Sequence, residues 1–516
     1  QEACNILAAL RGAYRRGMRE ELVRGVSAFA PFLLTRGWYA LADLHLQRAH
    51  QAARELDDAA GRATMLLYLA DVTEKLGDYA LAEAYVQEGL DLARQLASSG
   101  LLCDLLLQRG WVAYKRGAYA QAEGYYREGL HLARQSEHSG RLSSALTCMG
   151  LMVLEQGDYE QALTYFQEGL ALAQCSNLPA RISDLLACLG DVARRRGEHT
   201  RAESYFQEAL ALARQHGRSD RVSLLLSRLG EIARELGDYA QAERYVQEGL
   251  SLARPQCHLE RIGLLLLTLG AVSLDRGNYA QAETAFQEGL SLARQIEQWM
   301  GISYFLSLLG WVAWKRGEYT RMDAYYQEAL RLSRQFEHRE SICHLLSNLG
   351  MVAGERGDYA QAERYLQEGL SLARQIGHRE EISQLLTTLG KIAAECGDYT
   401  QAEDYLHEGL DLAQQVGVRW LMCEVLHERG EVELKRRRLE TAAATFRKAL
   451  AHAPHGHQER TAKVLYALGR VTALQGDLPE ARKFAAASLA IFEAIDNRKR
   501  STVRDWLASL PAMEAQ

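Results

Sequence analysis

The sequence predicts an all-α fold, an elongated α-solenoid in which similar helical units stack along the chain. A glycine followed two residues later by an aromatic recurs every 40 residues, as at Gly77 and Tyr79 and again at Gly117 and Tyr119. Between these turns, apolar residues recur at the three- and four-residue spacing of a helix. Self-similarity at this period indicates units that bury their apolar faces only against their neighbours, so we expect one long domain.

Each unit is predicted to contain two helices, helix A and helix B, joined by a short turn. In residues 221–254, two helical patterns are interrupted at Gly237 and Asp238. Glycine can adopt the positive φ that closes helix A, and aspartate is a good N-cap for helix B. The small residues Gly230 and Ala242 stand where the two helices are expected to cross closely.

These residues resemble the tetratricopeptide repeat (TPR) in their small, turn and aromatic positions: Leu229-Gly230, Gly237-Asp238-Tyr239, Ala242 and Tyr245-Val246. HEAT and armadillo repeats have similar periods but lack this combination. The resemblance implies a right-handed superhelical α-solenoid of about twelve helix-turn-helix TPR-like repeats. Each repeat is roughly six residues longer than the common form of about 34 residues. Longer repeats of this kind resemble those of kinesin light chains, spindle-orientation adaptors and bacterial signalling ATPases.

A glycine stands within helix B in many repeats, as at Gly89, Gly249 and Gly289, where alanine is usual. Each such glycine lowers the stability of the helix by about 0.5 to 1 kcal/mol relative to alanine. Because this loss recurs, we expect a neighbouring backbone or aromatic ring to approach helix B closely at these positions. The alternative is that repeat duplication copied a tolerated residue.

The pattern divides the chain into three parts. Residues 1–23 are predicted to form an N-terminal lead-in or capping helix, and residues 24–450 the solenoid with its strict 40-residue period. Residues 451–516 are expected to hold a degenerate last repeat and a C-terminal capping helix. Terminal units of a solenoid are commonly atypical because they close its ends.

Several single residues mark irregularities. Pro31 is expected to kink or restart the first helix A, and Pro255 to end a helix B early. Arg437 replaces the turn glycine, which indicates that the register weakens there. Residues 451–459 are predicted to be a loop, and residues 501–510, with Trp506, a final amphipathic helix covering the last repeat.

Composition argues against several function classes. The net charge of −6 over 516 residues lacks the basic excess that nucleic acid phosphates require. Nine cysteines, without a C-x-x-C pair, favour reduced thiols in a cytoplasmic protein. The chain shows no signal segment and no apolar run long enough to span a membrane. It opens with Gln1 rather than Met, which predicts that it belongs to a longer polypeptide.

The local signatures of nucleotide, zinc-protease and serine-hydrolase chemistry are absent, so we expect no enzyme activity, catalytic residues, cofactor or metal site in this chain. Cys343 and His344 are a conceivable nucleophile and base. However, adjacent helical residues point about 100° apart, which favours a structural role.

The concave surface, formed by helices A in TPR arrays, is the predicted partner-binding site. Two helices A carry a similar aromatic and cationic motif five repeats apart, suited to stacking and cation–π contacts. Packing between adjacent helices A is the alternative for these rings. Between the two motifs the face is polar and partly basic, so an acidic peptide would suit it, although solvated charge is the ordinary interpretation. The predicted residues are Trp111, Tyr114, Lys115, Arg194, Arg195, Arg228, Arg234, Tyr304, Trp311, Trp314, Lys315, His344, Asn348 and Gln384.

These observations favour a non-catalytic module that binds a protein or peptide. The array is similar to the C-terminal sensor region of bacterial STAND-type ATPases, which implies a nucleotide-binding switch upstream, autoinhibition relieved by target binding, and oligomerisation through the upstream domain. The rival hypothesis is a stand-alone adaptor or scaffold bridging two proteins, similar to kinesin light chains. A third is the regulatory part of an enzyme whose catalytic domain lies outside this chain.

Overall fold

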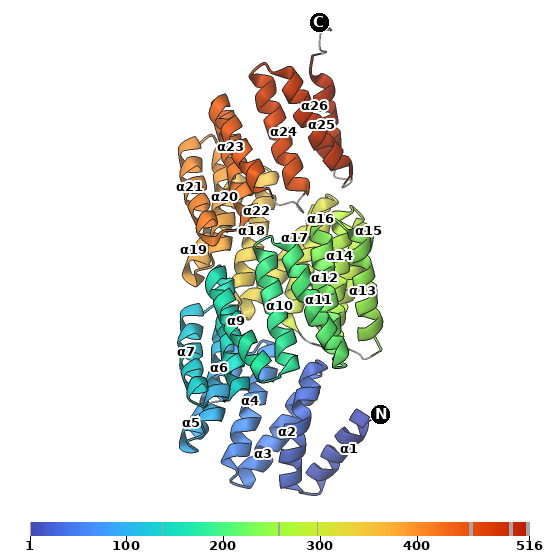
Figure 1. Ribbon diagram of the computed structural model, residues 1–516, viewed down its shortest axis with the longest axis vertical. Helices are drawn as coiled ribbons and strands as arrows, with labels where there is room; N and C mark the ends of the chain where they lie inside the picture. Colours follow the sequence, from blue (N-terminus) through green and yellow to red (C-terminus); the bar gives the residue numbers. More distant parts are fainter. Residues whose placement is uncertain are drawn as a thin grey trace.

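The computed structural model describes residues 2–136, 138–255, 258–296, 298–453, 458–494 and 499–511. Gln1 and part of the predicted loop at residues 451–459 lie outside the described residues. The described residues form a winding stack of helices, with the two ends of the chain at opposite ends of the molecule (Figure 1). This arrangement confirms the predicted all-α solenoid.

Twelve consecutive helix pairs, α2–α3 to α24–α25, form the repeats among the described residues, and α1 (Glu2–Arg15) and α26 (Lys499–Ser509) flank them. The helices A are α2 (Arg19–Thr35), α4 (Ala59–Leu76), α6 (Ser99–Lys115), α8 (Ser139–Glu155), α10 (Pro179–Arg195), α12 (Ser219–Glu235), α14 (Leu259–Asp275), α16 (Trp299–Lys315), α18 (Arg339–Glu355), α20 (Arg379–Glu395), α22 (Arg419–Lys435) and α24 (Gln458–Leu474).

The helices B are α3 (Tyr39–Glu55), α5 (Tyr79–Gln95), α7 (Tyr119–Gln135), α9 (Tyr159–Cys175), α11 (His199–Gln215), α13 (Tyr239–Ala253), α15 (Tyr279–Gln295), α17 (Tyr319–Gln335), α19 (Tyr359–Ile376), α21 (Tyr399–Val416), α23 (Leu439–His452) and α25 (Leu478–Ala494). Most helices A also contact the helix A of the next repeat. The helices A therefore form the inner face of the superhelix.

The turn between helix A and helix B uses the predicted chemistry. Gly237 has a φ of 82°, and the Asp238 carboxylate accepts a hydrogen bond of 2.9 Å from the backbone N–H of Gln241. Arg437, which replaces the turn glycine, adopts the same left-handed conformation with a φ of 60°. The turn geometry is therefore kept at Arg437, and α22 and α23 pair like the other repeats.

Close helix packing explains the small residues of both helices. A Cβ atom at Gly270 of helix A would lie 2.2 Å from the ring of Phe286, which belongs to helix B of the same repeat. A Cβ atom at Gly249 of helix B would lie 2.5 Å from Leu265 of the next helix A. Among the described residues, the close neighbour of a helix B glycine is therefore usually a leucine of the following repeat, and it is an aromatic ring only at Gly289, which faces Phe305.

The predictions made from Pro255, at the end of a helix B, and from Trp506, on the final helix, agree with the structure. α13 ends at Ala253, two residues before Pro255, and Trp506 of α26 packs edge-on against Tyr466, with 5.4 Å between ring centroids. Pro31 lies inside a single helix that runs from Arg19 to Thr35, so of the two predicted effects, a kink or a restart, the restart does not occur.

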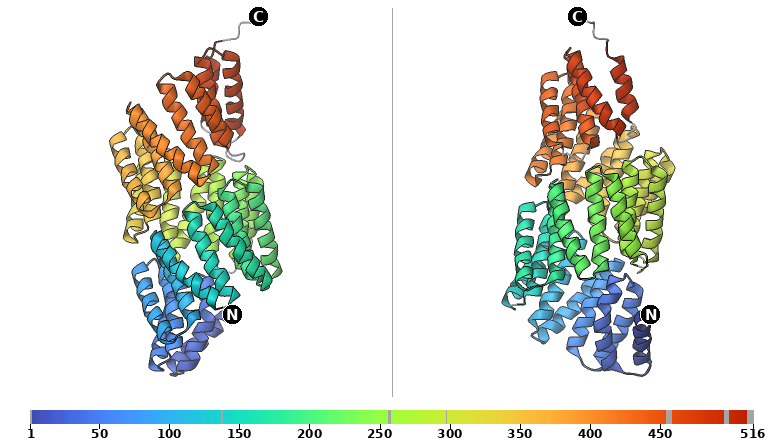
Figure 2. Two further views of the ribbon diagram at one scale, coloured as in Figure 1. Left: turned by 60° about the vertical axis from the view of Figure 1, so that its left-hand side comes forward. Right: turned by 45° about the vertical axis from the view of Figure 1, so that its right-hand side comes forward.

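Successive turns of the superhelix touch along a contact zone that we call the seam. Its two sides are joined by hydrogen bonds between residues 221 positions apart: Tyr39 with Glu260, Tyr79 with Met300, Arg116 with Glu337, and Tyr159 with Glu380. One turn therefore takes about five and a half repeats of 40 residues. Figure 1 and the rotated views of Figure 2 show α19–α21 stacked on the side of α5–α9.

The seam has an apolar centre. The indole of Trp299, which is 3% exposed, packs in one cluster with Tyr79 and Val112 of the preceding superhelical turn. Further along, Tyr119 packs with Ile376. Burial of such rings between turns stabilises the contact by roughly 25 cal/mol for each Å² removed from water.

Candidate functional site

The structure places all fourteen predicted partner-binding residues on helices A, the helices of the inner layer of the superhelix. They belong to α6, α10, α12, α16, α18 and α20. They do not form a single cluster, and the aromatic, arginine and polar groups have different surroundings.

The first aromatic motif lies on α6. The rings of Trp111 and Tyr114 stack with 5.2 Å between their centroids, and the ammonium of Lys115 lies 4.8 Å from the centroid of Trp111. Lys75 of the preceding helix A approaches the same indole to 5.8 Å. Tyr114 also contacts Tyr119 at 5.8 Å, so this motif borders the seam.

The second aromatic motif, on α16, is more deeply packed. Trp311 and Trp314 lie 4.6 Å apart, and Lys315 lies over both rings. Trp314 is only 6% exposed and belongs to the core formed by α15–α18. Trp314 is therefore a packing residue, whereas Trp311 remains half-buried and Tyr304, on the same helix, is 48% exposed.

The four predicted arginines are ion-paired within the chain. Their nearest carboxylates are Glu235 for Arg194 at 3.1 Å, Glu155 for Arg195 at 2.6 Å, Glu231 for Arg228 at 3.3 Å and Asp275 for Arg234 at 2.6 Å. This part of the inner face therefore carries compensated charge. An acidic ligand would have to compete with these carboxylates for the arginines.

The remaining predicted residues are polar and lie on two neighbouring helices. His344 is exposed and Asn348 half-buried on α18, and Gln384 is half-buried on α20. Cys343, adjacent to His344 in sequence, is fully buried, and burial raises the pKa of its thiol well above the ordinary range. The Cys343–His344 pair therefore has the structural character expected from its helical geometry.

A charged group around Lys75 was not predicted from the sequence. Glu74 lies 3.2 Å from Lys75, and burial raises the pKa of Asp71 to about 6 despite the opposing effect of Lys75. Lys75 and Lys115 occupy the same position in consecutive repeats. Comparing that position across all repeats would have revealed these additional inner-face charges.

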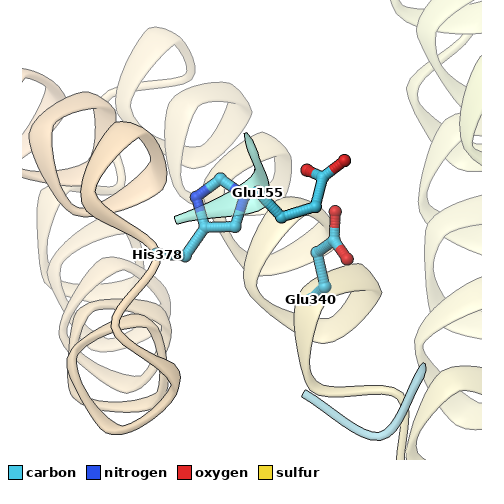
Figure 3. Close-up of side chains that lie close together, drawn as sticks. All are labelled: Glu155, Glu340 and His378. Carbon is cyan, nitrogen blue, oxygen red and sulfur yellow. The ribbon is translucent and has the colours of Figure 1, made fainter. Parts of the chain in front are cut away.

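Glu155, Glu340 and His378 were also missed, because they come from different superhelical turns. Glu155 is the last residue of α8, Glu340 lies in the first turn of α18, and His378 is the N-cap of α20. One side-chain N or O atom from each lies within 4.8 Å of the others. Figure 3 shows the three side chains converging from separate helices.

The three side chains have the residue types of a metal site, but the imidazole is poorly oriented for that role. Nδ1 of His378 accepts a hydrogen bond of 3.2 Å from the backbone N–H of Glu381. In the neutral ring the proton therefore resides on Nε2, the nitrogen turned toward Glu155 in Figure 3. A metal-binding histidine ligates the metal with one ring nitrogen and donates an N–H hydrogen bond from the other. His378 has the opposite arrangement: Nδ1 accepts a hydrogen bond, and Nε2 offers an N–H donor to the carboxylates.

A separate cavity of about 230 Å³ lies among α20, α22 and α26. Its charges are largely paired: Lys435 lies 2.8 Å from Glu395, and His427 lies 3.3 Å from Glu428. Burial opposes ionisation of Glu428, but His427 and nearby lysines lower its pKa to about 2.

Among the described residues, none of the helices combines the length and apolar character needed to cross a membrane.

Comparisons with known proteins identify the repeat class. The model of the MalT-like TPR region matches residues 105–257 and 231–427, and a tetratricopeptide repeat model matches residues 61–135 and 421–494. A search of curated proteins finds no match.

Several solved structures are similar to this chain at low sequence identity and with TM-scores below 0.5. A Rap protein complexed with competence and sporulation factor is 13% identical, with a TM-score of 0.48, covering 69% of this chain and 98% of that chain. Yeast Tom70 is 12% identical, with a TM-score of 0.44, covering 95% of this chain and 96% of that chain. The APC/C hetero-tetramer Cut9–Hcn1 is 17% identical, with a TM-score of 0.45, covering 93% and 95%.

These values support no transfer of function from the solved structures. The first family model, in contrast, spans more than half of the chain. The chain therefore belongs to the family of MalT-like TPR regions.

Proposed function

We propose that this chain is a non-catalytic recognition module that binds a peptide segment of another protein on its inner face. The TPR array supports a protein-interaction module in general. The inner face is the part of the array where side chains from several repeats converge. A segment lying there contacts many repeats at once, as the concave surfaces of solenoids allow.

The observation that carries this proposal is the environment of Lys115. Its ammonium lies over the rings of Trp111 and Tyr114, and among the described residues no carboxylate lies within ion-pair distance of it. Burial lowers the pKa of Lys115, although the charges of Glu74, Glu340 and Glu155 oppose this effect. An acidic side chain of the ligand would supply the missing partner, while an apolar side chain would cover the Trp111 indole.

We further propose that the chain is the ligand-sensing region of a larger, cytoplasmic STAND-type ATPase of bacteria. The family membership supports this proposal, since the chain resembles the sensor region of such ATPases. In the parent protein, ligand binding on the inner face would relieve autoinhibition and promote oligomerisation through the upstream domain. A stand-alone adaptor would bind in the same way but would show no such switch.

The binding site can be tested by photo-crosslinking in the full-length protein. A crosslinking residue at Tyr304, 48% exposed on α16, should capture the partner, whereas one at Tyr319, 46% exposed on α17, should not. With the captured partner, Trp111→Ala and Lys115→Ala should each weaken binding by about tenfold, because a buried aromatic or charged anchor contributes on the order of 1 to 2 kcal/mol.

Equal capture at Tyr304 and Tyr319 would contradict binding on the inner face. The parent is tested separately, by size-exclusion chromatography of the full-length protein with and without its partner in the presence of ATP. Partner-dependent assembly supports the sensor, and an unchanged elution position supports the adaptor.

A further inference from the structure

Two carboxylates of like charge meet across the seam. Glu155 belongs to the first superhelical turn and Glu340 to the second, and no hydrogen bond joins the two within the described residues. Glu340 is exposed, whereas Glu155 is half-buried and His378 is buried. Closing the seam therefore brings two negative charges within 4.8 Å of each other, which is unfavourable while both are ionised.

The charges around the two carboxylates only partly offset this repulsion. Arg195 is engaged by Glu155 at 2.6 Å, and Lys115 is held over its aromatic rings. The other titratable groups near the pair, element by element, are Tyr114 of α6, Tyr119 of α7, Tyr159 of α9, Cys343 of α18, and His378, Glu380 and Glu381 at the start of α20.

His378 adds a proton donor to this group. Its backbone position is fixed as the N-cap of α20, and its Nδ1 is occupied by the N–H of Glu381. Nε2 therefore presents an N–H donor toward the carboxylates. A proton taken up by Glu340 removes the repulsion between the two carboxylates across the seam.

We propose that Glu155, Glu340 and His378 form a proton-controlled latch that closes the seam beside the Lys115 site. Protonation of Glu340 holds the two superhelical turns together, and its deprotonation separates them. The regulatory meaning of the latch rests on the proposed function, because Lys115 and the latch share the same stretch of the inner face. The opening of the seam itself is independent of any ligand.

The direction of the pH dependence follows from Glu340. Loss of surrounding water and the nearby charge of Glu155 raise the pKa of Glu340 above its ordinary value of 4.5 in the closed arrangement. A group with a raised pKa stabilises the closed seam below its ordinary pKa, and this contribution is lost as the pH rises through the raised value. The molecule should therefore be compact at lower pH and expand as the pH rises.

The test is small-angle X-ray scattering of the whole chain from about pH 5 to about pH 8, a range that lies above the ordinary pKa of glutamate and so covers a raised one. The radius of gyration of the wild type should rise with pH. Glu340→Gln removes one of the repelling charges and should stay compact throughout. Glu208→Gln, at an exposed position of α11, is the matched control and should expand like the wild type.

A reversible lock tests the opening of the seam while Glu155, Glu340 and His378 stay in place, and the reduced double variant is the control for the loss of the Arg339 charge. A Cβ atom at Gly117 would lie 3.5 Å from Cβ of Arg339 across the seam, within the range of a disulfide. Oxidised Gly117→Cys/Arg339→Cys should lose the expansion and regain it on reduction, whereas Gly117→Cys alone should expand.

A wild type whose radius of gyration is independent of pH overturns the latch, as does a Glu340→Gln variant that still expands. Circular dichroism at each pH separates seam opening, which keeps the helical signal, from unfolding, which loses it. Failure of the proposed function would appear elsewhere, as unchanged partner binding in Trp111→Ala, and would leave the pH dependence intact.

Discussion

Gly77 lies directly against the indole of Trp299, 222 residues later in the chain: a Cβ atom at Gly77 would be 1.7 Å from Nε1 of that ring. The glycine therefore meets two requirements. It adopts a φ of 88°, which closes helix A of its repeat, and it leaves room for a ring of the next superhelical turn. Only the second requirement concerns the seam.

Replacement of Gly77 by alanine should consequently destabilise the protein more than the same change at Gly397. Gly397 has a φ of 87° and no heavy atom within 4 Å of its added Cβ, so it reports the backbone strain alone. That strain costs on the order of 1 to 3 kcal/mol. Chemical denaturation should show a larger loss for Gly77→Ala, and scattering should show expansion only for this variant. Equal losses would mean that the Trp299 contact contributes nothing.

The helix B glycines should respond in opposite directions to alanine. At Gly289 the new methyl would lie 2.3 Å from the Phe305 ring, so overpacking should destabilise the protein by about 1 to 3 kcal/mol. At Gly409 the nearest atom is 3.5 Å away, and alanine should stabilise the helix by about 0.5 to 1 kcal/mol. Thermal unfolding of the two variants measures the contrast. If alanine raised the stability at both sites, the glycines would be better explained as tolerated residues copied by repeat duplication.

Cysteine reactivity should divide by burial. Cys175 and Cys396 are exposed, whereas Cys103 and Cys423 are buried, and burial raises the pKa of each buried thiol to about 11. Since the thiolate is the reactive form, a maleimide or disulfide reagent should modify the exposed pair rapidly at neutral pH. Peptide mapping by mass spectrometry locates the modified thiols. Rapid modification of Cys103 or Cys423 in the folded protein would contradict the packing described.

Acid should weaken the inner face around Glu235. Burial alone would raise the pKa of this carboxyl, but His199 and Arg194 together lower it to about 2, from an ordinary 4.5. A lowered pKa means that the ionised form stabilises the fold above about pH 4.5, and that this contribution, on the order of 3 kcal/mol, is lost as the pH falls toward 2.

Glu235→Gln should therefore lose less stability than the wild type as the pH is lowered through this range. Urea denaturation at several pH values measures the difference, and Glu208→Gln serves as the exposed control. If Glu235→Gln and the wild type lose the same stability as the pH falls, ionisation of Glu235 does not link the stability of the fold to pH.

Much of the local structure could be predicted because it depends on neighbouring residues. The turn at Gly237, the N-cap at Asp238 and the early end of α13 before Pro255 follow from the conformational limits of single residues. The inner-face location of Trp111 and Trp311 followed from helical spacing, since residues three or four apart share a side.

The burial and ion pairing of the inner-face side chains were harder to predict than their location. Trp311 and Trp314 have similar surroundings in sequence, yet the second is buried in the core. Arg194 and Arg195 suggested a basic surface, but each is paired with a glutamate 40 or 41 residues away. Side-chain pairing between repeats depends on rotations that composition does not specify.

The sequence by itself determined the repeat, because its 40-residue period, turn glycines and apolar spacing act within one unit or between adjacent units. Only the tertiary structure decided the seam, in which Tyr159 meets Glu380 after 221 residues. The small rotation between neighbouring repeats accumulates over about five and a half units before the superhelix meets itself. A slight change in that rotation would bring different residues together, so no local pattern encodes the encounter of Glu155 with Glu340.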